Sequence, residues 1–504
     1  MQGPTGTNEP VRFPASFSGC RMTSFASRFS RSCLLAASLL LGAAVAAEPP
    51  EATWKAGPFD AKAREILARV IAFPTSLGNR KVPQMAEYLA GEFRSAGFPA
   101  EDVTIVPFKL PAEETAALVV RYRGDGTGGK PIVLMAHMDV VTAERADWER
   151  DPFTLIEENG FFYGRGTADN KQGVASLTTL FLRLKSEKFV PRRDLIIYFS
   201  GDEETAQSTS VLMAREHRHL IDAEYALNSD SGGGNLDDDT GKPTLYAVQT
   251  AEKTYADFML TTRNPGGHSS APRADNAIYD LASALTRLSH FSFPVMWNDT
   301  TIASFRESGK TTPGELGQAM KRFAENPRDE AAAKVLAGNP GTIGQTRTTC
   351  VATMLDGGHA ENALPQRATA NVNCRIFPGV KIDEVRATLA KVVGEGVDVA
   401  IKSDPLSSEP SPLRKDVFDT VKRVVHKFHP GVPVVPYQGS GATDGLVFRS
   451  IGIPTYAVDT IFIRDKDSFA HGLNERIPVK GFYEGLEMWY LMVKELAGTG
   501  KAKR

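Results

Sequence analysis

The stretch "DLIIYFSGDEET" (Asp194–Thr205) runs from an uninterrupted apolar segment into three consecutive acidic residues. An apolar segment without polar alternation is typical of a strand that is buried on both faces of a sheet. Similar segments occur at 131–141, "PIVLMAHMDVV", and at 223–230, "AEYALNSD", and a helical pattern lies at 173–187. Strands that alternate with helices predict an α/β fold with a mixed, mostly parallel sheet flanked by helices.

A different pattern begins after residue 251. Strand-like and helix-like segments follow one another in the order β-α-β-β-α-β, which is typical of a compact ferredoxin-like α+β module. Residues 294–347 are extra length inside this module, and a polar, proline-rich stretch then leads back to the first domain. We therefore expect a first domain in two parts, 48–251 and 403–504, with the module inserted at 252–402.

The N-terminal residues, 1–47, have the features of a secretory signal. From Arg28, a basic start leads into an apolar run of roughly 13 residues, too short for the about 20 that span a bilayer. Small residues then predict cleavage near Ala47, and Met22 fits as the natural start because signals begin close to their basic region. We expect a secreted or periplasmic protein; an uncleaved membrane anchor is the alternative.

The composition excludes some partners. A formal net charge of −2 with 23% charged residues gives no reason to expect nucleic-acid binding. Cys20 and Cys33 precede the predicted cleavage site, so only Cys350 and Cys374 remain in the mature chain. Their spacing suits neighbouring antiparallel strands, where they either form a disulfide after export or stay as two buried thiols.

Acidic residues and a histidine follow several predicted strands. His137 and Asp139 point to the same face of a strand because side chains alternate, and Asp169 lies in a glycine-punctuated loop before a helix. Taken singly, each has a structural explanation as a polar pair, a helix cap or a solvated carboxylate. Because the ends of parallel strands converge on one crevice, we expect these residues to meet. The acidic residues after the next two strands are Glu203, Glu204 and Asp230.

Converging carboxylates raise one another's pKa unless cations neutralise them. Two divalent cations that share one carboxylate would balance Asp169, Glu204 and Asp230, with His137 and His471 as neutral ligands. Oxygen and imidazole ligands without thiolate predict two zinc ions per subunit, with cobalt or manganese as alternatives.

The adjacent acidic residues have different predicted roles. Glu204 binds a metal ion, whereas Glu203 stays unligated and takes a proton from the attacking water. Asp202 points to the opposite side of the strand and is predicted to be structural.

The ordered set "AHMD", "GRGTADNKQG", "GDEE", "NSD", "GGHSS", "ENALPQRATANVNCRIFPG", "GSGATDG" and "FAHGLNE" resembles the M20 family of dinuclear zinc amidohydrolases. That family includes glutamate carboxypeptidase, aminoacylase-1, succinyl-diaminopimelate desuccinylase and Gly-Xaa carboxypeptidases. The resemblance runs from about Phe59 to Leu496. It implies a zinc-peptidase-like catalytic domain, and it makes the inserted module a lid, which pairs two subunits in many relatives.

The resemblance also implies individual roles. His268 would stabilise the oxyanion, often in the partner subunit's active site, and Arg375 would grip a substrate carboxylate. From the residues alone, His268 is an ordinary turn histidine and Arg375 a solvated strand residue. The other implied roles are His137, Asp169 and Asp230 for one ion, Asp169, Glu204 and His471 for the second, Glu203 as general base, Asp139 as partner of His137, and Asn362, Gly441 and Thr443 as further donors to the substrate.

These observations predict a secreted, zinc-dependent hydrolase of amide bonds adjacent to a free carboxylate, of the carboxypeptidase or dipeptidase type on short peptides. The alternatives are an N-acyl-amino-acid deacylase and a non-catalytic binding protein. A GxSxG elbow is missing from the sequence, so a serine hydrolase lacks its motif. A homodimer through the lid is expected unless the insertion at 294–347 covers the pairing edge. A stable membrane span is not expected after signal cleavage.

Overall fold

The computed structural model describes residues 57–402 and 405–500. The predicted signal, with Met22, Cys20 and Cys33, lies outside these ranges. Within them, no helix combines the length and the apolarity that crossing a bilayer requires.

Ten strands form one large mixed sheet in the order β1-β2-β6-β3-β7-β17-β9-β8-β18, with β16 beside β9. The neighbours β6, β3, β7 and β17 are parallel, whereas β1–β2, β2–β6, β17–β9 and β9–β8 are antiparallel. The strands are β1 (Val103–Lys109), β2 (Glu114–Tyr122), β3 (Ile132–His137), β6 (Leu195–Ser200), β7 (Tyr225–Asn228), β8 (Gly233–Leu236), β9 (Pro243–Glu252), β16 (Val434–Gly439), β17 (Thr455–Ala457) and β18 (Phe462–Arg464). A small sheet beside it has the order β19 (Arg476–Pro478), β5 (Phe161–Tyr163) and β4 (Ile156–Glu158).

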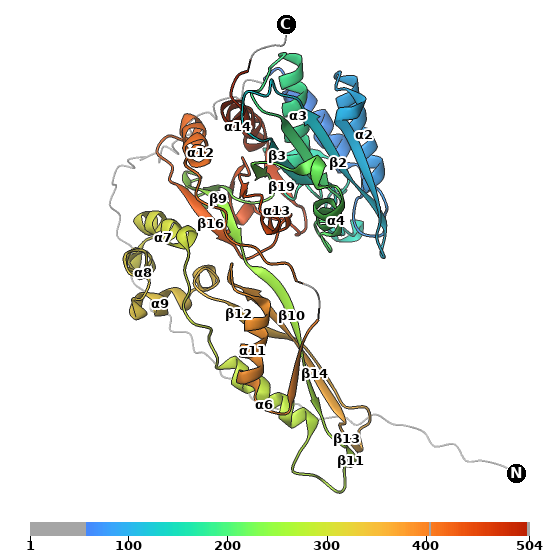
Figure 1. Ribbon diagram of the computed structural model, residues 1–504, viewed down its shortest axis with the longest axis vertical. Helices are drawn as coiled ribbons and strands as arrows, with labels where there is room; N and C mark the ends of the chain where they lie inside the picture. The colour runs from blue at the N-terminus through green and yellow to red at the C-terminus, as the bar shows by residue number, and fades with distance from the viewer. Residues whose placement is uncertain (1–56, 403–404, 501–504) are drawn as a thin grey trace, which may run out of the picture. The chain divides into compact units, whose positions relative to one another are not determined.

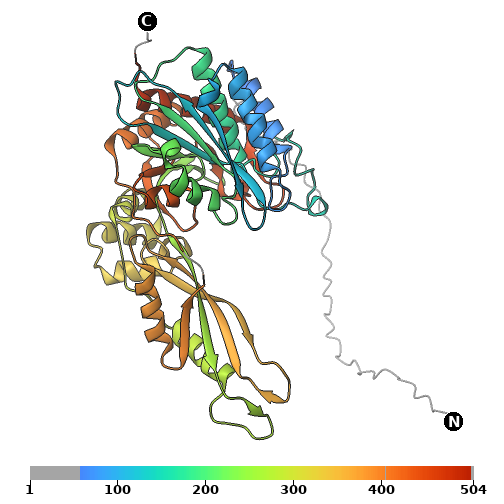
Figure 2. The ribbon, with the colours of Figure 1, turned by 45° about the vertical axis from the view of Figure 1, so that its right-hand side comes forward.

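Helices cover both faces of the large sheet, as the apolar strands predicted. Ile132 and Leu134 pack into one core, while Val133 and Met135 pack into the core on the other face. The first face carries α1 (Asp60–Ile71), α2 (Val82–Ser95), α3 (Lys171–Ser186), α12 (Lys415–Phe428) and α14 (Val479–Ala497), and the second carries α4 (Ser208–Glu216), α5 (Arg218–Ile221) and α13 (Gly445–Ser450). The blue helices α1 and α2 lie along the sheet (Figure 2), and α14 packs beside α3 although it is far away in the sequence (Figure 1).

The inserted module has the predicted β-α-β-β-α-β order. Its sheet is antiparallel, in the order β12-β14-β10-β15, and two helices pack on it (Figure 1). Its elements are β10 (Thr254–Arg263), α6 (Ala277–Ser289), β12 (Thr349–Gly357), β14 (Arg367–Ile376), α11 (Ile382–Val393) and β15 (Val397–Ile401), with a short pair, β11 (Gly267–His268) and β13 (Ala363–Leu364). We call these elements the lid. Cys350 and Cys374 face each other across β12 and β14 and form a disulfide, which decides between the two predicted alternatives.

The extra residues between α6 and β12 form a helical cluster with an apolar core of its own. The helices are α7 (Asp299–Thr311), α8 (Gly314–Glu325), α9 (Glu330–Ala337) and α10 (Pro340–Ile343). The cluster packs against β16 and β9 of the large sheet, and the buried hydroxyls of Thr250 and Thr300 lie 2.7 Å apart there. Within the described residues it leaves β12 exposed from Val351 to Gly357, so it does not cover the lid's outer edge.

Candidate active site

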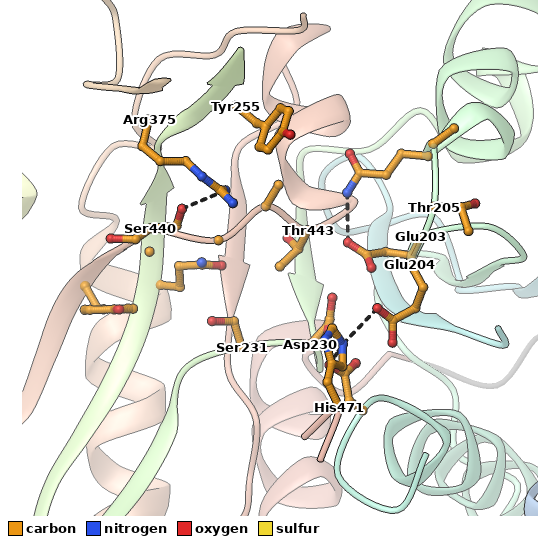
Figure 3. Close-up of a pocket in the computed structure, with 18 residues that line it drawn as sticks. Glu203, Glu204, Thr205, Asp230, Ser231, Tyr255, Arg375, Ser440, Thr443 and His471 are labelled. Atoms are coloured by element: carbon orange, nitrogen blue, oxygen red, sulfur yellow. Dashed lines mark hydrogen bonds and ion pairs between the residues drawn. The ribbon is translucent and has the colours of Figure 1, made fainter. Parts of the chain in front are cut away.

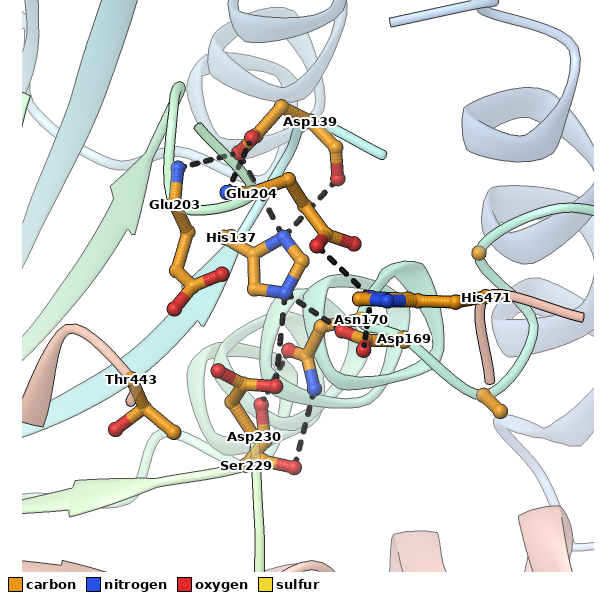
Figure 4. Close-up of polar contacts among 12 residues, drawn as sticks. His137, Asp139, Asp169, Asn170, Glu203, Glu204, Ser229, Asp230, Thr443 and His471 are labelled. Atoms are coloured by element: carbon orange, nitrogen blue, oxygen red, sulfur yellow. Dashed lines mark hydrogen bonds and ion pairs between the residues drawn. The ribbon is translucent and has the colours of Figure 1, made fainter. Parts of the chain in front are cut away.

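The five predicted metal ligands converge in two groups that share Asp169 (Figure 4). In each group, one nitrogen or carboxylate oxygen per residue lies within 4.8 Å of the others. The Nε2 atom of His137 is 2.8 Å from Asp169 and 3.5 Å from Asp230. The Nε2 atom of His471 is 3.2 Å from Asp169 and 2.8 Å from Glu204.

The order of the strands explains this convergence. His137 is the last residue of β3, Glu204 follows β6, and Asp230 follows β7. Because β6, β3 and β7 are parallel neighbours, their carboxyl ends meet at one edge of the sheet. The loop before α3 adds Asp169, and the loop before β19 adds His471.

The carboxylates of this cluster raise the pKa of both histidines. Burial lowers the pKa of His137, but the charge of Asp230 and hydrogen bonds with Asp139 and Asp169 outweigh burial and raise it well above its usual range. Hydrogen bonds with Asp169 and Glu204 raise the pKa of His471 to about 10. Each histidine therefore faces at least two carboxylates of the cluster.

The donor set fits two divalent cations. The Oε1 atom of Glu204 is buried and has no hydrogen-bond partner among the described residues. Such an unsatisfied carboxylate oxygen, on a side chain that contacts the imidazole of His471, is suited to a metal ion. All the donors are oxygen or imidazole nitrogen, which fits zinc, cobalt or manganese.

Glu203 lies beside this cluster but belongs to neither ligand group. The backbone N–H groups of Glu203 and Glu204 donate to the two carboxylate oxygens of Asp139, at 3.1 and 2.9 Å (Figure 4). Burial, and then the charge of Asp230, raise the pKa of the Glu203 carboxyl well above its usual range. A partly buried carboxyl that lines the cavity next to the ligands has the position that a general base requires.

Asp139 contacts His137 through both its backbone oxygen and its carboxylate. The His137 Nδ1 atom is 3.0 Å from the backbone oxygen of Asp139, while the carboxylate is 3.6 Å away. Strand β3 ends at His137, so the alternation that would align the two side chains stops there. Asp202, as predicted, is structural: its carboxylate accepts hydrogen bonds from the N–H groups of Ser208 and Thr209, both at 2.8 Å, and caps α4.

A cavity of about 670 Å³ opens over this cluster and reaches Arg375 (Figure 3). The guanidinium lies 4.7 Å from the ring of Tyr255, its neighbour across the ladder, and donates to the backbone oxygen of Ser440 at 3.1 Å. It forms no ion pair with any carboxylate of the described residues. An arginine that faces a cavity and has no carboxylate partner of its own is suited to binding a substrate carboxylate.

The predicted substrate donors Gly441 and Thr443 are both part of the cavity wall. Thr443, however, uses its donors internally, because its hydroxyl and its N–H both donate to Glu252, at 2.5 and 3.3 Å. Glu252 in turn forms a buried ion pair with Arg449 at 2.7 Å. In this conformation Thr443 therefore fixes the wall and offers neither donor to a substrate.

His268 and Asn362 lie next to each other, but neither lines the cavity. The N–H of Ser269 donates to the backbone oxygen of Asn362 at 3.0 Å. His268 and Asn362 are both exposed. In the lid ladder, Tyr255 pairs with Arg375 at one end and Arg263 with Arg367 at the other. The eight residue steps from Tyr255 to Arg263 span roughly 27 Å. His268 follows Arg263 in the sequence, so it lies beyond the end of the lid sheet that is opposite to Arg375.

Sequence reasoning missed a buried ion pair that joins the two ligand loops. Glu475 accepts hydrogen bonds from the N–H groups of Ala168 and Asp169, at 2.7 and 3.0 Å, and pairs with Arg165 at 2.6 Å. Arg165 also donates to the backbone oxygen of His471 at 3.3 Å. Both charges stand in the glycine-containing motifs "GRGTADNKQG" and "FAHGLNE", which mark the two residues but do not show that they pair.

Comparison with known proteins agrees with this site. The profile of Peptidase family M20/M25/M40 matches residues 133–495. The chain belongs to this family. It is thus an M20-type metallopeptidase or amidohydrolase, and the non-catalytic alternative is set aside.

The matched relatives differ in the reactions that their names give. The chain is 29% identical over 435 residues to the human N-fatty-acyl-amino acid synthase/hydrolase PM20D1, covering 83% of this chain and 84% of that protein. It is 25% identical to a probable carboxypeptidase S-like 2 of Dictyostelium discoideum, covering 77% and 75%. An M20 family metallo-carboxypeptidase of Sulfolobus solfataricus has the same fold, with a TM-score of 0.64, 19% identity, and 86% and 99% of the two chains covered.

Proposed function

We propose that the protein is an exported, dinuclear zinc hydrolase that cleaves an amide bond next to a free carboxylate in a short peptide or an N-acyl amino acid. One observation carries this proposal: two ligand groups share Asp169, and the cavity that Asp169, Glu204, Asp230 and His471 line is also lined by Glu203 and by Arg375, which has no ion-pair partner among the described residues. Export is supported by the disulfide between Cys350 and Cys374, because disulfides persist in oxidising compartments.

The residues divide the reaction between them. Two divalent cations, when bound, supply Lewis-acid chemistry that polarises a carbonyl and makes water a better nucleophile. Glu203 takes the proton of the attacking water and then gives it to the leaving nitrogen, as one group does when it acts first as base and then as acid. Arg375 binds the substrate carboxylate with its planar fork, which places the amide between the base and the ligand groups.

The lid of a second subunit is proposed to supply His268 as the oxyanion donor. His268 lies at the lid end opposite to Arg375 within its own chain, so a partner subunit is the available route to a cavity. The outer strand β12 exposes Val351, Met354 and Leu355, at 58, 66 and 70%. An unpaired edge strand with apolar side chains is suited to pairing with a second copy.

Peptide hydrolysis and deacylation remain two candidate reactions. The similarity to the human N-fatty-acyl-amino acid synthase/hydrolase over most of both chains favours deacylation. The cavity wall favours short or polar substrates, because its side chains include Thr205, Gln207, Ser231, Gln249 and Tyr437.

A hydrolysis screen tests the proposal. Purified protein would be given dipeptides and N-acyl amino acids of increasing acyl length, each with and without a chelator, and the products would be quantified. Chelator-sensitive cleavage only of substrates with a free carboxylate supports it. Equal cleavage of the carboxamide analogues contradicts the role of the carboxylate.

A further inference from the structure

Gln207 has an unusual backbone conformation beside the proposed general base. Its φ of 52° and ψ of 24° lie in the left-handed region, which residues other than glycine rarely adopt. Its side-chain Nε2 donates to Oε1 of Glu203 at 2.8 Å, a contact drawn as a dashed line at Glu203 in Figure 3. Gln207 also lines the cavity, and no step of the proposed reaction has used it.

The surrounding loop holds this conformation in place. The N–H of Gln207 donates to the backbone oxygen of Asp202 at 2.9 Å, and the N–H of Val211 donates to the backbone oxygen of Gln207 at 3.1 Å. Glu203 lies inside the turn that the first of these bonds closes, and the second bond belongs to the start of α4. Non-glycine residues in the left-handed region persist only when their surroundings fix them, and they concentrate at functional sites.

The side chain of Gln207 is not needed to start helix α4. It makes no capping hydrogen bond, although Gln207 occupies the position just before the helix. Asp202 caps the helix instead, through Ser208 and Thr209. The amide of Gln207 is therefore free to serve Glu203.

We infer that Gln207 is a positioning residue that gives the two oxygens of Glu203 different tasks. The amide holds Oε1, and no described residue forms a hydrogen bond with Oε2. Oε2 is then the oxygen that receives the proton from water and returns it to the leaving nitrogen, while Gln207 keeps its own protons throughout. This inference rests on the proposed function of Glu203.

The test compares Gln207→Gly with the parent enzyme on the best substrate of the hydrolysis screen. Glycine adopts the left-handed region freely, so the backbone is kept while the amide is removed. We expect kcat to fall roughly 10- to 100-fold, as for loss of a hydrogen bond to a charged group, with KM changed less than about twofold and an equal or higher Tm. Gln207→Asn keeps an amide and tolerates this backbone but is one methylene shorter, so its kcat should fall similarly.

A matched control separates backbone effects from effects at the base. Lys188 also has a left-handed backbone, with φ of 53°, and it lies outside the cavity. Lys188→Gly should change Tm as Gln207→Gly does and should keep the parental kcat. In a Glu203→Gln background, Gln207→Gly should alter the residual rate less than about twofold.

The outcomes distinguish the inference from the function on which it rests. A parental kcat in Gln207→Gly, or a rise in KM alone, overturns the inference and leaves the proposed function standing if Glu203→Gln is inactive. Parental turnover by Glu203→Gln overturns both.

Discussion

The carboxyl edge of the large sheet and the lid supply the proposed site in different ways. On the large sheet, parallel neighbours bring His137, Glu204 and Asp230 to one point of one chain. In the lid, antiparallel strands carry Arg375 to one end of the sheet and His268 beyond the other. The parallel strands therefore concentrate functional residues at one point within the subunit, whereas the lid separates Arg375 from His268, and under the proposed function the His268 end would act in the site of another subunit.

Removing the base tests the large-sheet half of this comparison and should have the largest effect. Glu203→Gln should lower kcat by about three orders of magnitude, because a positioned general base contributes on the order of 10²- to 10⁴-fold. It should keep its metal, as measured by elemental analysis of dialysed protein. His471→Ala, which removes a ligand, should lose both metal and activity. Loss of metal from Glu203→Gln would show that Glu203 is a ligand instead.

Mixing two inactive variants tests the lid half. His268→Ala alone should lower kcat roughly 100-fold, as for loss of one oxyanion donor. When His268→Ala is unfolded and refolded together with Glu203→Gln, a mixed dimer contains one complete site and one site that lacks both residues. Random 1:1 assortment makes half of the dimers mixed, so the activity should return toward a quarter of the parental value. Refolding each variant alone is the control. Failure of the mixture to regain activity while the parent refolds would place His268 outside the partner's site.

The carboxylate anchor should have a smaller effect, confined to substrate recognition. Arg375→Ala should lower kcat/KM by about 10- to 100-fold for a carboxylate substrate, since a charge-assisted hydrogen bond contributes about 1.5–3 kcal/mol. Arg375→Lys should recover only part of this loss because a lysine lacks the planar fork. An unchanged kcat/KM in Arg375→Ala, measured on the same substrate, would exclude the anchor role.

Metal uptake should depend on pH through the histidines of the large-sheet edge. The pKa of His471 is raised to about 10 in the metal-free protein, so a dication must displace its proton below that pH. Zinc affinity should therefore rise as pH increases from 6 to 9, and binding should release protons, measurable by calorimetry in two buffers of different ionisation enthalpy. The same raised pKa stabilises the metal-free fold below the unfolded value of about 6.5, and this contribution is lost as pH rises through about 10. An affinity independent of pH would contradict the assignment of His471 as a ligand.

The sequence predicted the large-sheet edge more completely than the lid, for a physical reason. Strands β3, β6 and β7 are apolar throughout because both faces are buried, and their ends are marked by polar residues. Strand β9 (Pro243–Glu252) was missed because its sequence "PTLYAVQTAE" mixes polar and apolar residues. The lid order was predicted, but the ends at which His268 and Arg375 lie follow from strand register, which periodicity does not specify.

The contacts that orient the ligands were also beyond sequence reasoning. Arg165 and Glu475 are 310 residues apart, and nothing in either motif states that one side chain reaches the other. The same applies to Asp139, whose carboxylate accepts hydrogen bonds from the backbone N–H groups of Glu203 and Glu204 in addition to lying 3.6 Å from Nδ1 of His137. A motif gives the types of the functional residues. Which side chains contact each other depends on where each loop leaves its strand.

Removal of the disulfide should have the smallest effect on activity, because both cysteines belong to the lid. It joins residues that are 24 positions apart, and cross-links of this size typically contribute about 3 kcal/mol. Replacing both cysteines, Cys350→Ser with Cys374→Ser, should lower the free energy of unfolding of the lid by about that amount in a denaturant titration. The metal content should be unaffected at 25 °C, because the ligands lie on the large sheet. The activity that is regained when His268→Ala and Glu203→Gln are refolded together should also be unaffected, because β12 keeps its ladder with β14. Loss of metal from this double variant would show that the two regions are energetically coupled, and the division drawn between them would then fail.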